Sequence, residues 1–232
     1  MNQGPFIFLG VFCTMALSWY AMVFGPTLQL GTRQIETVES TGSRYPSARA
    51  GLAQQGREVY RANGCNYCHT QQVRPKSRGS DFDRGWGIRP SVAQDYVLDH
   101  PVMLGRERIG QDLMNIGVRQ TNQVWHLLHL YNPQLTSPGS VMPPYRFLFQ
   151  KQKIKGQPSP DALKLDGKTG LESGYEIVPK QEARALVEYL LSMDAQLPLF
   201  EAPLPPKRQS GDTNATPAQA STNASGTTPA VK

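Results

Sequence analysis

Apolar residues are distributed unevenly along this chain, and the longest apolar run lies at its N-terminus. Residues 5–30 carry no charge, and the first charged residue is Arg33. A transmembrane helix needs about 20 mostly apolar residues, and aromatic residues such as Trp19 and Tyr20 favour the membrane interface. The run therefore predicts a single transmembrane anchor over residues 1–30.

A cleaved signal peptide is the alternative interpretation of the same run. Ala16-Leu17-Ser18 provides a small-x-small cleavage site, but the preceding MNQG has no Lys or Arg, and the run continues well past Ser18. Cys13 lies inside the run and is interpreted as a small apolar helix residue. The distribution of basic residues leaves the orientation open, because Arg33 and others follow the run and none precedes it.

Three later segments show apolar residues at the spacing of an amphipathic helix. They are residues 48–62, 121–133 and 179–193. Thr121 is expected to cap the second helix and Pro179 to open the third. Their apolar faces contain Leu52, Ala53, Val59 and Tyr60, then Val124, Leu127, Leu128 and Tyr131, then Ala183, Leu186, Val187, Leu190 and Leu191. The chain beyond the anchor is therefore expected to be mainly α.

Composition divides the rest of the chain into three parts. Residues 31–47 form a polar linker, residues 48–200 a folded domain, and residues 201–232 a low-complexity Pro/Ala/Ser/Thr/Asn tail that is expected to be disordered. With 39% apolar residues, the chain as a whole is not of a disordered type. The net charge of +6 comes from scattered basic residues without a recognition motif, so no nucleic-acid partner is expected.

The segment GCNYCHT, residues 64–70, carries the most specific chemistry. A closed structural zinc site needs four Cys/His ligands, usually with a second CxxC or HxxxH pair, and this chain of three cysteines has no such second pair. A thioredoxin-like dithiol would follow a buried strand, but the residues before Cys65 contain no β-branched run. In C-x-x-C-H, Cys65 and Cys68 can form thioethers with a haem and His69 can bind its iron. The motif therefore predicts one covalent haem c, since it occurs once.

An electron-transfer haem needs a second axial ligand opposite His69. The candidates are Met103, Met114, Met142, Met193, His100, His126 and His129. Met142 is preferred, because its turn-rich loop GSVMPPYR can direct the thioether at the iron without helix constraints, as in His/Met cytochromes c. His126 and His129 lie three residues apart and could suggest a metal pair, but the interpretation as hydrogen-bonded polar groups near the haem or an interface is favoured.

The predicted core matches that of small c-type cytochromes. A helix before the haem motif and another at the end of the domain would cross closely if Gly56 faced the bulky Tyr189. The fold class is therefore expected to be mainly α, with one N-terminal transmembrane helix and a class I-like cytochrome c domain.

An ordered series of motifs resembles one family in particular. GREVYRANGCNYCHTQQVRP, DHPVMLGRERIGQDL, WHLLHLYNP and MPPY follow each other behind a single N-terminal apolar run. The chain resembles the membrane-anchored monohaem subunit II of cbb-type cytochrome c oxidases, which are C-family haem-copper oxidases. The resemblance covers residues 1–150 and the last helix.

The resemblance implies the following assignments. Cys65 and Cys68 would be the thioether sites, and His69 and Met142 would be the axial ligands. The chain would have no catalytic site of its own and would pass electrons to the oxygen-reducing core of the complex in aerobic respiration. Its partners would be the catalytic haem-copper subunit and other cytochrome c subunits, and its haem domain would lie on the periplasmic side of the inner membrane.

Two features depart from the family pattern. Gln111 stands where the family usually has proline, whose preceding turn holds the proximal histidine through a backbone carbonyl, so His69 could be held differently here. Residues 150–178 form a longer insert than expected. A haem subunit of a nitric oxide reductase, a membrane-tethered carrier and a haem-based sensor or peroxidase remain alternative interpretations.

A basic segment follows the haem motif. It contains Arg74, Lys76, Arg78, Arg84 and Arg89, together with Trp86. A solvated loop cluster is one interpretation, and contact with haem propionates or with an anionic partner surface is the other.

Overall fold

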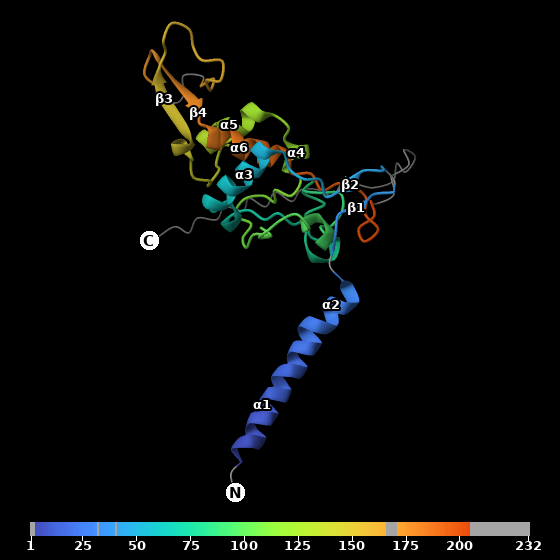
Figure 1. The fold of residues 1–232 in the computed structure, drawn as a ribbon. Coiled ribbons are helices and arrows are strands. Elements are labelled where there is room, and N and C mark those ends of the chain that lie inside the picture. Colours follow the sequence, from blue (N-terminus) through green and yellow to red (C-terminus); the bar gives the residue numbers. More distant parts are fainter. Residues whose placement is uncertain (1–2, 32, 40, 166–170, 205–232) are drawn as a thin grey trace, which may run out of the picture.

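The computed structural model describes residues 3–31, 33–39, 41–165 and 171–204, and in it a long N-terminal helix leads into a folded domain (Figure 1). The helix consists of α1 (Gly4–Trp19), a π-helical turn η1 (Tyr20–Phe24) and α2 (Gly25–Leu30). Gly4–Gln29 is apolar and long enough to cross a membrane, and its most apolar stretch has no residue buried against the rest of the chain. The expected anchor is therefore a candidate membrane span.

Pro26 accounts for the π-helical turn. Proline has no N–H group, and its ring clashes with the carbonyl four residues earlier, here that of Met22. The helix widens just before this point, where the N–H of Gly25 donates to the carbonyl of Tyr20, five residues back. The wider turn keeps Gly25 bonded within the helix, as a lipid environment requires.

The segment expected to be a linker is folded onto the domain. It forms a short antiparallel hairpin of β1 (Glu36–Thr37) and β2 (Arg44–Tyr45). Val38 and Tyr45 are buried, and the Tyr45 hydroxyl donates to Asp95 over 2.7 Å. The folded part of the chain thus begins before residue 48.

Two helices cross at the centre of the domain, α3 (Gly51–Ala62) and α6 (Gln181–Leu191). At the crossing, a Cβ atom on Gly56 would lie 1.8 Å from the carbonyl oxygen of Ala185 and 2.8 Å from the Cβ of Tyr189. Only glycine allows such a close approach of two backbones. The expected close crossing of Gly56 and Tyr189 is confirmed.

A third helix, α5 (Gln123–Tyr131), packs against α6. The prediction of Thr121 as its cap is wrong by one residue, because the side chain of Asn122 accepts the N–H of Trp125 over 3.1 Å. Pro179 likewise does not open the last helix, which begins at Gln181, because Pro179 ends a strand.

The two ends of the predicted insert at 150–178 pair with each other as a β-hairpin. Strands β3 (Phe149–Lys153) and β4 (Tyr175–Pro179) pair antiparallel with Phe149 opposite Pro179, and they project from the end of the domain far from the anchor (Figure 1). The hairpin is held to the core by Phe149 and Ile177, which are buried.

Short elements complete the domain between these helices and strands. They are α4 (Ile116–Arg119) and the 3₁₀ turns η2 (Cys65–Tyr67), η3 (Lys76–Arg78), η4 (Ala93–Tyr96), η5 (Pro133–Leu135) and η6 (Arg146–Leu148). After α6, Ala202 is buried and pairs with Leu199, so the fold extends past residue 200. Most of the predicted tail, residues 205–232, lies outside the described residues.

Candidate haem crevice

The CxxCH motif begins three residues after the end of α3 and lies at the edge of the core. Gly64, with a φ of +67°, turns the chain out of the helix and into η2. Its left-handed backbone is one that glycine adopts readily. The N–H of His69 donates to the carbonyl of Cys65 over 3.0 Å, which folds the motif into a compact loop. Cys65, Cys68 and His69 consequently line the same cavity.

This cavity has a volume of about 460 Å³. The CxxCH residues line one part of it, and Met142 and Tyr145 line another. A smaller cavity of about 50 Å³ adjoins it and is shared by His69, His129 and Met142. The volume lies in the usual range of cofactor sites, roughly 300 to 1,000 Å³. Two free thiols, an imidazole, a thioether sulfur and an apolar lining fit a haem c.

The pKa of Cys65 contradicts the dithiol interpretation of the motif. Burial raises the pKa of the Cys65 thiol to about 12. A reactive CxxC pair instead has a lowered thiol pKa, because the thiolate is the attacking species. The Cys65 thiol is thus unsuited to act as the attacking thiolate of such a pair.

His69 is oriented by a backbone carbonyl. Its Nδ1 lies 2.7 Å from the carbonyl oxygen of Gln111, and since a carbonyl can only accept, Nδ1 carries the proton and donates it. Burial also lowers the pKa of His69 and so favours the neutral ring. Nε2 is then left with a free lone pair, which is the form of histidine that binds a metal. Despite the Gln111 departure, the carbonyl of residue 111 itself holds the ring.

Gly110 lies flat against the same imidazole. A Cβ atom at this position would be 2.2 Å from Cε1 of His69, 2.6 Å from Nδ1 and 2.7 Å from Nε2. The N–H of Gly110 donates to the carbonyl of Cys68 over 2.9 Å, which brings the loop against the motif. Glycine is therefore required here by the ring of His69, and the sequence analysis missed this residue.

A buried carboxylate joins the two segments on either side of the ring. Asp112 is fully buried and accepts the Thr70 hydroxyl over 2.6 Å and the N–H of Gln72 over 2.7 Å. Arg108 adds its own bonds, to the Thr70 hydroxyl and to the carbonyl of Gln72, over 2.9 and 2.6 Å. The segment after His69 and the segment after Gly110 are thus tied together by charge-assisted hydrogen bonds.

The side chain of Gln111 is itself restrained. Arg119 donates to Gln111 Oε1 over 2.7 Å, and its other terminal nitrogen donates to the carbonyl of Asp112. A proline at this position would restrict φ covalently, whereas glutamine leaves it free. The two hydrogen bonds from Arg119 restrain the loop instead. The loop is therefore restrained even though glutamine replaces the proline of the family pattern.

Met142 lies on a loop fixed at several points. Its N–H donates to the Ser140 hydroxyl over 3.2 Å, and Gln134 binds the carbonyl of Ser140 and the N–H of Gly139. Further along, the N–H of Tyr145 donates to a carbonyl of α5, that of Leu130. The loop therefore holds Met142 at the cavity through backbone and side-chain bonds on both sides.

The other candidate axial ligands lie elsewhere. Met103, Met114 and Met193 are buried in the hydrophobic core, and His100 lines a separate hollow on the surface. His126 faces the carbonyl of Gln120 over 2.8 Å. Of the candidates named from the sequence, Met142 and His129 line the cavity, and the assignment of Met142 as the ligand stays a prediction.

His129 is bonded on its Nδ1 side. Nδ1 lies 2.6 Å from the Thr136 hydroxyl, and the ring stacks on Trp125 with centroids 4.7 Å apart. Burial, followed by repulsion from His126 and His69, lowers the pKa of His129 to about 4. Within the part of the chain that the structure describes, no group of three His, Cys, Asp or Glu residues could hold a metal ion. Both histidines of the pair have hydrogen-bond partners, His126 at the carbonyl of Gln120 and His129 at the Thr136 hydroxyl.

The basic segment after the motif divides into two kinds of residue. Arg89 is buried and forms an ion pair with Asp95 over 2.6 Å. For this residue, the expectations of a solvated loop position and of a contact with haem propionates or a partner surface were therefore both wrong. Trp86 is also buried, between the guanidinium groups of Arg84 and Arg108. The remaining basic residues, Arg74, Lys76, Arg78 and Arg84, are exposed.

Fold and crevice together define a class of protein. Two helices cross at a glycine, the first ends in CxxCH, and a crevice lies between a histidine and a methionine. This is the arrangement of a monohaem cytochrome c domain, here behind a candidate membrane span. The family described as cytochrome c oxidase, mono-heme subunit/FixO matches residues 3–196, and the chain belongs to this family.

The chain is accordingly a monohaem cytochrome c oxidase subunit, a protein that transfers electrons in a complex with other oxidase subunits. The family resemblance seen in the ordered motifs is confirmed. A comparison with curated proteins found no match.

Proposed function

We propose that this chain is the membrane-anchored electron-transfer subunit of a cbb-type oxidase and that it carries one covalent haem c. It passes electrons to the oxygen-reducing core in aerobic respiration. The observation that supports this most is the convergence of Cys65, Cys68, His69 and Met142 on one cavity, in a chain whose family is that of the monohaem oxidase subunits.

Each of these residues has a distinct role. Cys65 and Cys68 would hold the haem through thioethers, and His69 and Met142 would bind its iron. The haem supplies one-electron chemistry. Gly110 and the carbonyl of Gln111 fix the ring of His69, so an iron bound by His69 and Met142 would rearrange little on gaining an electron. The fixed site favours transfer over ligand binding.

The rim of the cavity is suited to contact with a partner subunit. Ile109 and Val141 line the cavity and are 63% and 78% exposed. Tyr67, within the CxxCH loop, is 67% exposed. An apolar rim around a cofactor edge favours docking that excludes water. The partners proposed here are the catalytic haem-copper subunit and other cytochrome c subunits.

The proposed topology is single-pass in the inner membrane, with residues 1–30 as anchor and the haem domain on the periplasmic side. Covalent haem attachment of this kind takes place on the outer, oxidising side in the resembling family. A fixed subunit also gains effective concentration from being held beside its acceptor.

Haem staining after denaturing electrophoresis tests the covalent attachment. Haem should stay on this chain, because thioethers survive denaturation. Complete extraction of haem into acid acetone would contradict the assignment.

Mild-detergent extraction and anchor deletion test the role in the membrane. The chain should come out with a large polytopic haem-copper subunit, and deletion of residues 1–30 should abolish its support of membrane oxygen consumption while the haem stays reducible. Purification of the full-length chain alone would point to a tethered carrier. Co-purification with a nitric-oxide-reducing core would point to that complex instead.

A further inference from the structure

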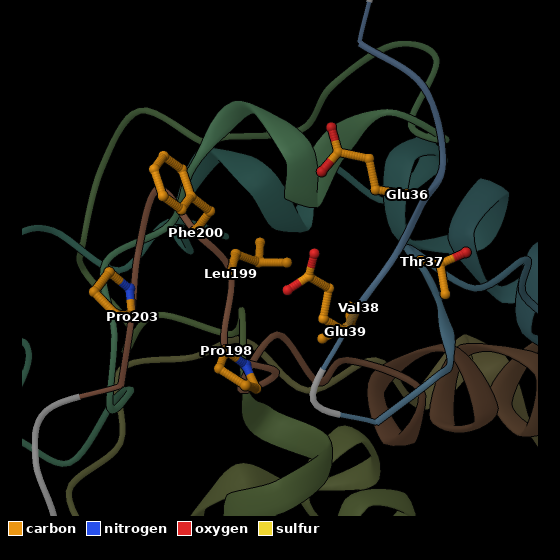
Figure 2. Close-up of a pocket in the computed structure, with 8 residues that line it drawn as sticks. All are labelled: Glu36, Thr37, Val38, Glu39, Pro198, Leu199, Phe200 and Pro203. Carbon is orange, nitrogen blue, oxygen red and sulfur yellow. The ribbon is translucent and has the colours of Figure 1, made fainter.

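A second large cavity lies away from the haem crevice, between β1 and the segment after α6. It has a volume of about 670 Å³. Figure 2 shows Phe200 and Pro203 on one wall, and Glu36 and Thr37 on the other, on the chain that comes from the anchor. The cavity is therefore bounded by two segments that are far apart in sequence.

Phe200 lies in a tight turn at the wall of this cavity. Leu199 and Ala202 pair with each other, the N–H of Ala202 donating to the carbonyl of Leu199 over 3.0 Å, so Phe200 and Glu201 form the tip. Ala202 is buried, whereas the side chain of Phe200 is fully exposed. The neighbours of Phe200 are also apolar, namely Pro198, Leu199, Pro203 and Leu204. The turn thus holds an apolar group outward.

The turn is bound to the chain just beyond the anchor. Arg33 forms ion pairs with Glu201 at the tip and with Glu36, the latter over 3.9 Å. The next residue is held as well, because Gln94 donates to the carbonyl of Gln34 over 2.6 Å. Arg33 lies three positions after Leu30, the end of α2, and three residues span at most about 10 Å. Phe200 is consequently held close to the end of the anchor.

This inference rests on the proposed role of residues 1–30 as a transmembrane anchor, whose end would then lie at the level of the lipid headgroups. The span Gly4–Gln29 has 26 residues, which corresponds to a helix about 39 Å long. The hydrocarbon core is about 30 Å thick and the bilayer with its headgroups roughly 40 to 45 Å. The last turn of the helix therefore reaches the headgroup layer, and the turn at residues 198–204 lies beside it.

We propose that Phe200 and the apolar turn 198–204 rest in the interfacial layer of the membrane and form a second membrane contact. Aromatic and apolar side chains favour this layer, and the carboxylates of Glu36 and Glu201 are paired with Arg33. One helix alone would let the haem domain tilt about the end of α2. A second contact restricts the tilt and so fixes the direction in which the haem crevice faces.

A nitroxide label at position 200 tests this contact. The full-length holoprotein carries Cys13→Ala and Phe200→Cys and is placed in phosphatidylcholine vesicles with the haem reduced. The matched control is Phe147→Cys, whose parent side chain is 59% exposed and lies next to β3, far from the anchor. Collisions with oxygen, which concentrates in lipid, are compared with collisions with a water-soluble nickel complex.

The ratio of oxygen to nickel collisions should be several-fold higher at position 200 than at position 147. Because the contact is apolar, raising the salt concentration should leave the ratio unchanged. Equal ratios at the two positions would place the turn in water and overturn the proposal. Exclusion of both reagents from position 200 would mean that protein covers it, which also overturns a lipid contact. The result does not depend on which residues ligate the haem iron.

Discussion

Replacing Gly110 with alanine tests the geometry of the proposed proximal ligand. Gly110 does not require a left-handed backbone, so alanine introduces no backbone strain and acts only through its methyl group. The new Cβ would lie 2.2 Å from Cε1 of His69, whereas ordinary contact begins at 3.4 Å, so the ring or the loop must move by about 1.2 Å. Overpacking of this kind typically costs about 1–3 kcal/mol.

That free energy acts directly on the proposed bond between His69 and iron. Since each 1.4 kcal/mol is a factor of ten, the population in which His69 is displaced should rise by about 5- to 150-fold. Displacement of the ring leaves five-coordinate, high-spin iron. Resonance Raman and electron paramagnetic resonance spectra report the spin state, and carbon monoxide binding by the ferrous protein reports the open position.

Gly51→Ala is the matched control, because nothing lies within 4 Å of a Cβ at Gly51, at the start of α3. It should leave the spin state unchanged. If Gly110→Ala also kept a fully low-spin iron and bound no more carbon monoxide than the wild type, His69 either would not lie against Gly110 or would not be an iron ligand.

Three further predictions concern the surroundings of the crevice. Met142→Ala should leave the haem attached, lower its reduction potential and let the ferrous protein bind carbon monoxide, because a thioether ligand is lost; unchanged carbon monoxide binding would exclude Met142. Arg119→Ala removes two hydrogen bonds to the loop of Gln111 and should lower the free energy of unfolding by about 1–3 kcal/mol, measured with guanidinium chloride; a variant as stable as the wild type would contradict the proposed restraint. The pKa of His129 is about 4 in the folded protein and near 6.5 when unfolded, so the unfolded chain binds more protons between these values and stability should fall as pH drops from 6.5 to 4. His129→Gln should flatten that loss in acid unfolding curves, and an unchanged slope would show that other groups cause it.

Local features of the sequence were sufficient for the anchor, the main helices and the haem motif. A run without charge predicts a span by composition alone, and the candidate span Gly4–Gln29 agrees with it. Apolar residues at a spacing of 3.6 predict helices, and α3, α5 and α6 are all present. Such patterns depend on neighbours along the chain, so one sequence contains them in full.

Contacts between distant segments were decided only by the tertiary structure. Arg89 lies in a basic segment but is buried against Asp95, and Gly110 is required by a ring 41 positions earlier, that of His69. The order of residues does not state which carbonyl faces which ring. Each of these pairings depends on how a long loop closes over the core, and burial then favours arrangements in which charges and backbone groups find partners.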